Sequence, residues 1–395
     1  MRALCAELGE PQREYRSLHV VGTNGKSSVT TMAAAVLEAS GLRTGACISP
    51  HAERWSERTR LGGAEIAGAE FEAAVAEVAS AVERAEARLG EGERITQFEA
   101  AIAASFVAFA RGGVEVAVVE AGLGGRLDAT NVIPSVATAL TSVGLDHTQW
   151  LGETELEIAA EKLAVLREGT TLVLGDVSRE VADLARRTAT ERRASVIDAA
   201  ELDPPELPAG TPPFLRRDAT VAVALARVAS PELDEAAIAA GLAASGLPGR
   251  AEPIAGDPPL IADAAHNAQG AEALAEALPD LAGGRPVVAC VSVLEEKDAA
   301  AIAAALAPAL DHAVCTAADP GPAMGRPGAR ALDAGRLAEA FAAAGVDAET
   351  VPDPGAAVER ALALAAERQG VALCAGSHYL LRYAWTPRRA QNSSR

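Results

Sequence analysis

The residues in this chain with the clearest chemical potential form a glycine-rich turn near its start. The turn follows the apolar run SLHVV and consists of Gly22, Thr23, Asn24, Gly25, Lys26, Ser27 and Ser28. Glycines let backbone N–H groups turn inward around a phosphate, the following helix adds its positive end, and a lysine supplies a charge to the β- and γ-oxygens. Residues 22–28 are therefore predicted to bind nucleotide phosphates. The string departs from G-x-x-x-x-G-K-[ST] because Val20 stands at the first glycine position.

Lysine is scarce in this chain, which makes each lysine informative. Of 35 basic residues only Lys26, Lys162 and Lys297 are lysine, so arginine serves wherever a general cation is needed. Each lysine is a candidate for chemistry that a guanidinium cannot perform. Lys162 lies in the half-apolar pattern IAAEKLAVL, where it could equally extend its charged end from an apolar surface into solvent.

A second cluster, VVEAGLGGRLDATNV, begins with a carboxylate at the end of an apolar run. Glu120 and the glycine-rich turn after it are expected at the carboxyl edge of a parallel sheet, where open α/β folds bind their ligands. Carboxylates, waters and substrate phosphates are the ligands that Mg²⁺ prefers, so Glu120 is a candidate magnesium ligand. Taken alone, the string also fits a strand closed by a tight turn.

Two further strand ends carry polar groups. Asp146 and His147 follow the run TSVGL, although a single histidine is a weak metal signal and is more often a packed residue. In LIADAAHNAQGAEAL, the residues Asp263, His266 and Asn267 stand between a strand-like run and a helical pattern. They too are expected at a sheet's carboxyl edge.

The elements that must position these groups alternate along the chain. Strand-like runs cover residues 17–21, 114–119, 135–143 and 171–174, with helical patterns such as 28–40 between them. This alternation predicts an α/β fold with a largely parallel sheet. The acidic, alanine-rich stretch 68–89 predicts an exposed amphipathic helix.

Proline and glycine clusters mark the chain's divisions. The string DPPELPAGTPPF at 202–213 predicts an irregular loop, and SGLPGRAEPIAGDPP at 245–259 precedes a new series of strand-like runs. We therefore expect one domain over 1–247, a second over 248–385 and a disordered polar tail over 386–395.

The charge balance excludes several classes of partner. The 395 residues include 54 acidic and 35 basic side chains, for a net charge of −19, which disfavours nucleic acid and anionic membranes. No segment approaches the roughly 18 apolar residues that span a bilayer, and the first residues lack a signal peptide's apolar core. Five scattered cysteines predict buried thiols in a reducing compartment, so we expect a cytoplasmic protein.

Eight strings occur together in one order: GTNGKSS, SPHAERWSER, TQFEAAIAASF, EAGLGGRLDATNV, DHTQWLG with its downstream AAEK, LPGRAE, DAAHN and CAGSHYLL. With these strings, nearly the whole chain resembles the folylpolyglutamate synthase/dihydrofolate synthase family of the Mur ligase superfamily. The resemblance implies a P-loop ATPase domain of the Mur ligase type, with a mostly parallel sheet, and a smaller C-terminal, Rossmann-like α/β domain for glutamate ligation.

The resemblance also implies an activity. A ligase of this family uses ATP to form an acyl phosphate and adds L-glutamate to reduced folates, extending tetrahydrofolate, and to 7,8-dihydropteroate, with Mg²⁺ as cofactor. Its expected partners are these small molecules, and the chain is expected to be a monomer. The alternatives are a folylpolyglutamate synthase alone, a muramoyl-peptide ligase, or a nucleotide-binding protein without catalytic activity.

The same resemblance implies roles for individual residues. The ATP site would comprise residues 22–28 with Asp218, Arg250 and Asp263. The Mg²⁺ ligands would be Ser49, Glu120 and His147. Contacts to the pterin-bearing substrate would come from Thr96, Leu127, Asp128 and Ala129. The catalytic groups would be Lys26, Lys162 as an N6-carboxylated lysine, and His266 and Ser377 beside the acyl phosphate or glutamate.

Four departures from the family pattern stand out. Ser27 replaces a glycine, Asp218 stands where asparagine is more typical, and DAAHNA replaces DGAHNP. The added charge of Asp218 weakens the case for its nucleotide contact. Only 21 residues precede the phosphate loop, and the longer segment usual in the family helps to form the dihydropteroate site, so a misassigned start or reduced dihydrofolate synthase activity would follow.

Overall fold

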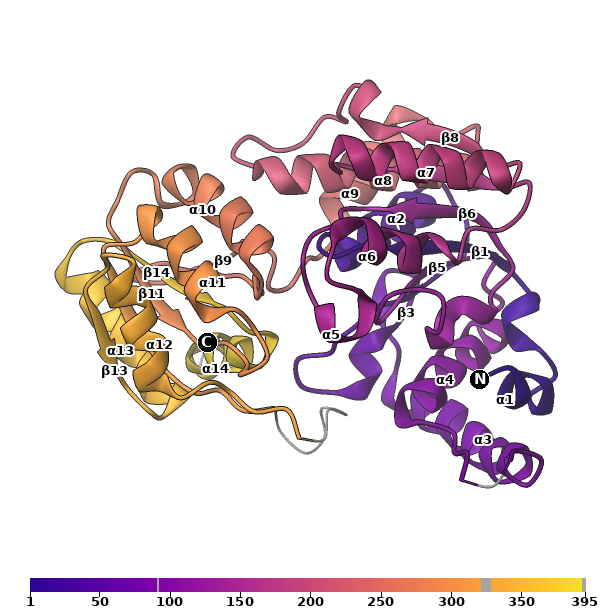
Figure 1. The fold of residues 1–395 in the computed structure, drawn as a ribbon, viewed down its shortest axis with the longest axis horizontal. Helices are drawn as coiled ribbons and strands as arrows, with labels where there is room; N and C mark the ends of the chain where they lie inside the picture. The colour runs from indigo at the N-terminus through magenta and orange to yellow at the C-terminus, as the bar shows by residue number, and fades with distance from the viewer. Residues whose placement is uncertain (91, 321–327, 393–395) are drawn as a thin grey trace. The chain divides into compact units, whose positions relative to one another are not determined.

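The computed structural model describes residues 1–90, 92–320 and 328–392. Contacts between residues divide the chain into two compact units, Met1–Gly246 and Leu247–Arg395, and each contains its own sheet with helices against it (Figure 1). The division lies one residue from the boundary that the proline- and glycine-rich string predicted.

In the described part of the first unit, eight strands form one sheet in the order β4-β3-β2-β5-β1-β6-β7-β8. The strands are β1 (Arg16–Val21), β2 (Thr44–Cys47), β3 (Thr59–Leu61), β4 (Ala64–Glu65), β5 (Val116–Glu120), β6 (Ser135–Leu140), β7 (Thr171–Leu174) and β8 (Ser195–Asp198). The six strands from β2 to β8 are parallel, and β3 and β4 add an antiparallel edge. The carboxyl ends of β5, β1 and β6 are therefore neighbours.

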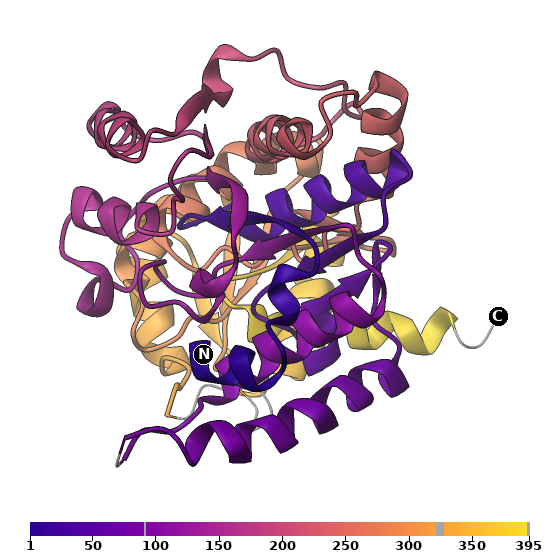
Figure 2. The same ribbon diagram turned by 90° about the vertical axis from the view of Figure 1, so that its right-hand side faces the viewer.

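Helices of the first unit pack in groups. The long helices are α2 (Lys26–Ala39), α3 (Gly68–Glu86), α4 (Gln97–Arg111), α6 (Glu155–Leu163), α7 (Arg179–Glu191), α8 (Pro213–Ala229) and α9 (Glu235–Ala244); α1 (Arg2–Glu7) and α5 (Thr148–Leu151) are short. Helix α2 contacts α8, α9 and the central strand β5. Helix α3 packs against α4 and α1 (Figure 2) and buries only a narrow alanine- and valine-rich stripe, as an amphipathic helix should.

The described strands of the second unit form a six-stranded sheet in the order β13-β12-β11-β14-β10-β9. They are β9 (Glu252–Ile254), β10 (Leu260–Ala262), β11 (Val287–Val291), β12 (His312–Cys315), β13 (Ala348–Thr350) and β14 (Val371–Ala375). All are parallel except β9, which runs antiparallel to β10. Because β11 and β14 are covered on both faces, they are continuous apolar runs in the sequence.

Two apolar cores cover the two faces of this second sheet. One core contains side chains of α10 (Ala268–Ala282), α11 (Ala299–Leu306) and α12 (Ala334–Ala343). The other contains side chains of α13 (Pro354–Glu367) and α14 (His378–Asn392). A parallel sheet between helical layers is the arrangement that the alternating sequence predicted, so the α/β fold class is confirmed.

Some expectations from the sequence need correction. The short strands β2, β3, β4, β8, β9 and β13 were not predicted, since they are two to four residues long and contain polar, glycine or proline residues. The tail predicted as disordered from residue 386 is helical up to Asn392, because α14 continues beyond its apolar anchor into the helix-favouring string RRAQ; residues 393–395 lie outside the described residues. The cysteines are buried free thiols, as predicted.

Candidate active site

The phosphate-loop candidate lies between β1 and α2, at the carboxyl edge of the first sheet. Gly25 adopts φ +81°, a left-handed conformation that favours glycine, and it precedes the first residue of α2, Lys26. Strand β6 fixes the loop from the side: Asn24 N–H donates to Ser142 Oγ at 2.9 Å, and Thr141 Oγ1 donates to the Asn24 carbonyl at 2.6 Å. The loop is thus held before any ligand binds.

Two lysines converge on this loop. Lys26 Nζ donates to the Thr23 carbonyl at 3.0 Å, and Lys162 Nζ, from the last turn of α6, donates to the Gly22 carbonyl at 2.7 Å. Lys162 is only 4% exposed, and burial, together with the nearby charge of Lys26, lowers its pKa to about 7. The lowered pKa makes the neutral amine of Lys162 accessible near neutral pH.

The turn after β5 is fitted closely to the helix that carries Lys162. Arg126 N–H donates to the Glu161 carbonyl at 3.0 Å. A β-carbon at Gly125 would lie 2.7 Å from the Glu161 carbonyl oxygen and 2.8 Å from that of Lys162. Only glycine permits this approach, so the turn and the end of α6 form one structure.

Glu120 joins the phosphate loop to the segment after β2. Its Oε2 accepts from Ser49 N–H at 3.0 Å, and its Oε1 accepts from Ser27 Oγ at 3.1 Å. The side chain is buried at the end of β5. A carboxylate beside the Ser27 hydroxyl provides hard oxygen donors, which suit a divalent cation such as Mg²⁺ or Mn²⁺.

His147 lies on the loop after β6, which is separated from β5 by β1. Its backbone has φ +52°, its N–H donates to Asp146 Oδ1 at 2.9 Å, and its Nε2 is 3.9 Å from that oxygen. Among the described residues, no group of three or more His, Cys, Asp or Glu side chains is arranged to hold a metal ion. A cation here would therefore need hydroxyl, water or phosphate oxygens as well, which is usual for Mg²⁺ with nucleotides.

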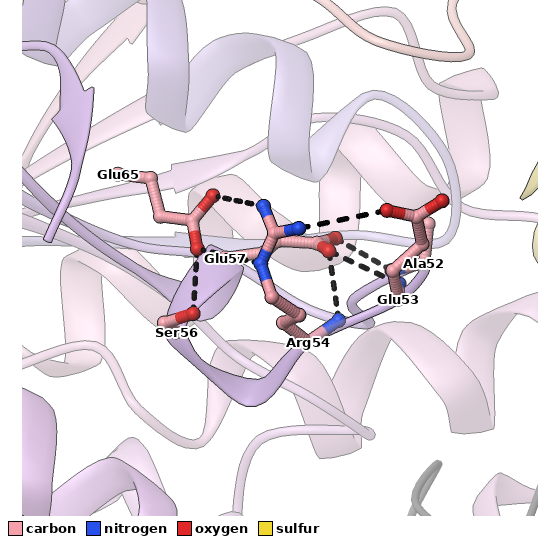
Figure 3. A network of polar contacts seen from close by, with 6 residues as sticks. All are labelled: Ala52, Glu53, Arg54, Ser56, Glu57 and Glu65. Atoms are coloured by element: carbon pink, nitrogen blue, oxygen red, sulfur yellow. Dashed lines mark hydrogen bonds and ion pairs between the residues drawn. The ribbon is translucent and has the colours of Figure 1, made fainter. Parts of the chain in front are cut away.

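The segment after Ser49 is stiffened by a polar network that the sequence did not reveal (Figure 3). The Glu57 carboxylate accepts from the three consecutive N–H groups of residues 52–54, at 2.8, 3.0 and 2.8 Å. The Arg54 guanidinium in turn pairs with Glu65 at 2.9 Å. The only hint was the density of charges in SPHAERWSER, a pattern that also fits a solvated loop.

The turn that contains Asp128 closes on itself. Asp128 Oδ2 accepts from Leu123 N–H at 2.9 Å, and Oδ1 accepts from Thr130 N–H at 2.9 Å and from the Thr130 hydroxyl. Burial raises the pKa of Asp128, and these donors oppose that rise. Its carboxylate thus faces its own backbone, whereas the neighbouring Leu127 side chain is 93% exposed.

The remaining predicted substrate contacts lie beside this turn. Thr96 is the N-cap of α4, and its Oγ1 accepts from Glu99 N–H at 3.1 Å. Phe98, in the first turn of α4, lies against Gly122, where a β-carbon would be 2.5 Å from the ring. Ala129 is buried in the 3₁₀ helix η3 (Ala129–Val132) that follows. The structure therefore brings the start of α4 and the turn after β5 together.

Asp218 also lies at the phosphate loop. It projects from the second turn of α8, and a β-carbon at Gly25 would overlap its carboxylate oxygen. A negative charge against a loop shaped for phosphate is unfavourable in itself, so nothing in this contact explains why asparagine is replaced here.

In the second unit, the Asp263 carboxylate joins the backbone just before β9 to the backbone just after β10. Its Oδ2 accepts from Ala251 N–H at 2.6 Å and its Oδ1 from Ala265 N–H at 2.7 Å. Burial raises the pKa of Asp263, and the charge of Arg250 opposes that rise. Arg250 Nη1 donates to the Gly249 carbonyl at 3.0 Å. Arg250 and Asp263 are therefore brought together at the start of this unit.

His266 and Ser377 follow the adjacent strands β10 and β14. His266 Nδ1 lies 2.8 Å from the Ala264 carbonyl, and its ring is 5.5 Å from that of His378. Ser377 is buried, and its Oγ accepts from Tyr379 N–H at 3.2 Å. The carboxyl ends of β10 and β14 are thus followed by imidazoles and a hydroxyl.

Comparisons with known proteins match this geometry. Residues 249–378 match the Mur ligase glutamate ligase domain. The chain is 36% identical over 354 residues, 80% of this chain and 72% of its relative, to a dihydrofolate synthase/folylpolyglutamate synthase of Mycobacterium tuberculosis. The chain belongs to the folylpolyglutamate synthase/dihydrofolate synthase family. It is therefore an ATP-dependent ligase of the Mur ligase fold.

Two solved structures of this family are similar over almost the whole chain. Escherichia coli FolC in complex with DHPP and ADP has a TM-score of 0.86 and 28% identity, and the match covers 99% of this chain and 92% of that one. A folylpolyglutamate synthase/dihydrofolate synthase of Yersinia pestis with AMPPNP and Mn ion has a TM-score of 0.81 and 30% identity, with coverage of 98% and 92%. The Mn ion in the Yersinia pestis structure supports a divalent metal in this family. None of the helices described in this ligase is long and apolar enough to cross a membrane.

Several contributors to this ligase's candidate site were missed in the sequence. Thr141 and Ser142 bond the phosphate loop from β6, and Ser292, buried after β11, accepts from Ala318 N–H at 2.9 Å. All three are polar residues at the ends of apolar runs, which is the signal that identified Glu120. Hydroxyls were passed over because Ser and Thr at a strand end are as common in plain turns.

Proposed function

We propose that this ligase adds L-glutamate to tetrahydrofolate and to 7,8-dihydropteroate through an acyl phosphate. The observation that carries the proposal is the preformed loop of residues 22–28, onto which Lys26 and Lys162 converge and to which Ser27 ties Glu120. Such a loop supports transfer of a terminal phosphoryl group. The resemblance to a structure complexed with DHPP supports the second acceptor.

The reaction has two steps. A carboxylate oxygen of the folate attacks the γ-phosphorus of ATP, the bond to the β-phosphate oxygen breaks, and ADP leaves. The glutamate amine then attacks the acyl carbon, the amide forms, and inorganic phosphate leaves with the amine proton transferred to a base or water. Lys26 would neutralise the charge of the transferring phosphoryl group, and the acyl phosphate must be shielded from water until the amine arrives.

We assign the metal site to Ser49, Glu120 and His147, with Mg²⁺ as the cation. Glu120 and Ser49 already contact each other, and their oxygens suit this ion. When bound, the cation would neutralise phosphate charge. The protein's own part is to hold Glu120 in place, which Ser27 and Ser49 do with two hydrogen bonds.

Lys162 is proposed to react with carbon dioxide. The neutral amine nitrogen would bond to the carbon of CO₂, and one amine proton would leave to solvent, which gives a carbamate with one negative charge. The pKa of about 7 provides the neutral amine that this step needs. The remaining N–H could still donate to the Gly22 carbonyl, so the carbamate need not disrupt the loop.

Binding roles complete the proposal. Residues 22–28, Asp218, Arg250 and Asp263 would contact ATP, and His266 and Ser377 the acyl phosphate or glutamate. Thr96, Leu127, Asp128 and Ala129 would form the contacts to the pterin-bearing acceptor. Because the Asp128 carboxylate is engaged by its own turn, we assign its contribution to the shape of that turn and the direct contact to the exposed Leu127.

Product mass spectrometry tests this function. The purified protein, with Mg-ATP and glutamate, is given tetrahydrofolate or dihydropteroate, and a Lys26→Met variant serves as the inactive control. A gain of one glutamyl unit on both acceptors is expected. A gain on tetrahydrofolate alone would make the chain a folylpolyglutamate synthase only, and no gain on either would contradict the proposal.

A further inference from the structure

A histidine in the middle of β1 is linked to the turn after β5. The His19 side chain is 0% exposed, and its Nε2 lies 2.8 Å from Thr130 Oγ1. The Thr130 hydroxyl also contacts Asp128 Oδ1. These three side chains form a continuous polar chain from the interior of the first sheet to the carboxylate that closes the turn.

Each hydrogen bond between His19, Thr130 and Asp128 has a defined direction. An ionised carboxylate only accepts, so the Thr130 hydroxyl donates its proton to Asp128. The Thr130 oxygen must then accept from His19, which places the imidazole proton on Nε2. Nδ1 is buried without a hydrogen-bond partner. Burial and the charge of Arg167 lower the pKa of His19 to about 3, so the ring stays neutral.

Asp128 connects this series of hydrogen bonds to the backbone of the turn. Its two oxygens hold Leu123 N–H at the beginning of the turn and Thr130 N–H just after its end. Rotation of the carboxylate would release both, and the exposed Leu127 side chain stands directly before Asp128. A donor that fixes the rotation of the Asp128 side chain therefore fixes the surface that Leu127 presents.

The segment after Asp128 is also anchored from a second side. Arg167 Nη2 donates to the Asn131 carbonyl at 2.8 Å and to the Ile133 carbonyl at 3.0 Å. Arg167 therefore fixes the backbone of η3, whereas His19 fixes the side-chain hydroxyl of Thr130 within it. Only His19 is connected to the carboxylate.

We propose that His19 is a positioning residue that sets the conformation of the acceptor-binding turn, residues 122–128, through Thr130 and Asp128. This rests on the proposed function, in which that turn contacts the folate. His19 touches no substrate in this account. It donates to the Thr130 hydroxyl, which in turn donates to the Asp128 carboxylate. Its replacement should therefore affect folate binding and not ATP binding.

Three substitutions and a control test the hydrogen-bonded series His19–Thr130–Asp128. His19→Leu removes the donor, Thr130→Val removes the hydroxyl at nearly constant volume, and His19→Gln returns an N–H donor. Ser17→Ala is the matched control, since Ser17 lies on the same face of β1, is equally buried and has a hydroxyl without a partner. Thr130→Val carries the test if His19→Leu does not fold.

Steady-state kinetics give the first readout. In His19→Leu and Thr130→Val, KM for tetrahydrofolate should rise about tenfold, the loss expected for one hydrogen bond, with KM for ATP within twofold of the wild type. His19→Gln should recover most of the loss, and Ser17→Ala should match the wild type. A parallel rise in both KM values, or the same rise in Ser17→Ala, would show general destabilisation and overturn the proposal.

Hydrogen–deuterium exchange without substrates gives a readout that does not depend on activity. The amides of Leu123 and Thr130 should exchange at least about tenfold faster in His19→Leu and Thr130→Val, and unchanged exchange in both would overturn the proposal. If the wild-type protein adds no glutamate to tetrahydrofolate, the proposed function fails. Faster exchange in that case would still support the positioning of the turn and would remove only its assignment to folate.

Discussion

Asp128 in the first unit and Asp263 in the second perform the same mechanical task with different surroundings. Each is buried beyond the carboxyl end of a parallel strand, and each carboxylate joins two separate backbone N–H groups, those of Leu123 and Thr130 for Asp128 and those of Ala251 and Ala265 for Asp263. Burial raises the pKa of both. Asp263, however, is balanced by the Arg250 guanidinium, whereas Asp128 is supported by a neutral hydroxyl.

The comparison extends to the cations of the two units. The first sheet's carboxyl edge carries Lys26 and Lys162, which point at the phosphate loop, and neutral donors hold Asp128. In the second unit the positive charge of the Arg250 guanidinium acts on the buried Asp263 carboxylate. A cation that only balances charge can be arginine, and a cation that must lose its proton has to be lysine. The difference accounts for a lysine at position 162, where the proposed reaction needs a neutral amine, whereas Lys26 is assigned a role as a charge.

The largest test of this comparison exchanges the two kinds of cation. Lys162→Arg should lose turnover by about 1000-fold or more, since arginine keeps the charge but provides no neutral amine, while ATP affinity measured by calorimetry should change less than about threefold. Arg250→Lys is the matched exchange in the second unit, and it should cost only about tenfold, since the charge beside Asp263 is retained. Equal losses in the two variants would remove the distinction.

A second test uses pH. The pKa of Lys162 is about 7 in the folded protein against 10.5 for an ordinary lysine, so the unfolded chain binds more protons between these values. The resulting destabilisation is fully present below pH 7 and disappears as pH rises to 10.5, by roughly 5 kcal/mol at most.

Calorimetry in CO₂-free buffer can isolate this effect by comparison with Lys162→Met. The variant should be more stable than the wild type at pH 7, and the difference should shrink toward pH 10.5. Lys297→Met is the control, because it removes a lysine of the second unit and leaves the surroundings of Lys162 unchanged. A constant difference between wild type and Lys162→Met across this range would contradict the lowered pKa.

The smallest expected effect comes from the two aspartates themselves. Asp128→Asn and Asp263→Asn each keep one acceptor oxygen, and each should lose about 1–3 kcal/mol of stability. The loss should be larger in Asp263→Asn, because the partly buried Arg250 charge nearby is then no longer balanced by a carboxylate. Urea unfolding of both variants decides the order, and a larger loss in Asp128→Asn would reverse the comparison.

The fold was largely predictable because buried parallel strands such as β5 and β11 are continuous apolar runs in the sequence. The tight turn between β1 and α2 could be predicted for a similar reason, since its glycines restrict what the backbone there can do. The edge strands β3 and β4 could not, because their pairing depends on neighbours and not on their own composition.

The interior of the site was less predictable. In SLHVV, His19 occupies an ordinary strand position, and its partner Thr130 is 111 residues away in the sequence. The sequence also marks Asp128 as functional without indicating that its carboxylate turns toward its own backbone. Residue type and order identify the turn, but the direction of a side chain depends on contacts that form only in the folded chain.

The burial of every cysteine has a practical consequence for studying this enzyme. Burial raises the pKa of Cys5, Cys47 and Cys315 to about 12, and Cys290 and Cys374 are also enclosed. Thiol-directed dyes react with the accessible thiolate, so the native chain should give almost no background labelling. Leu127→Cys, at a position that is 93% exposed, would carry a single fluorophore on the acceptor turn. Changes in its fluorescence would then report substrate binding at that turn.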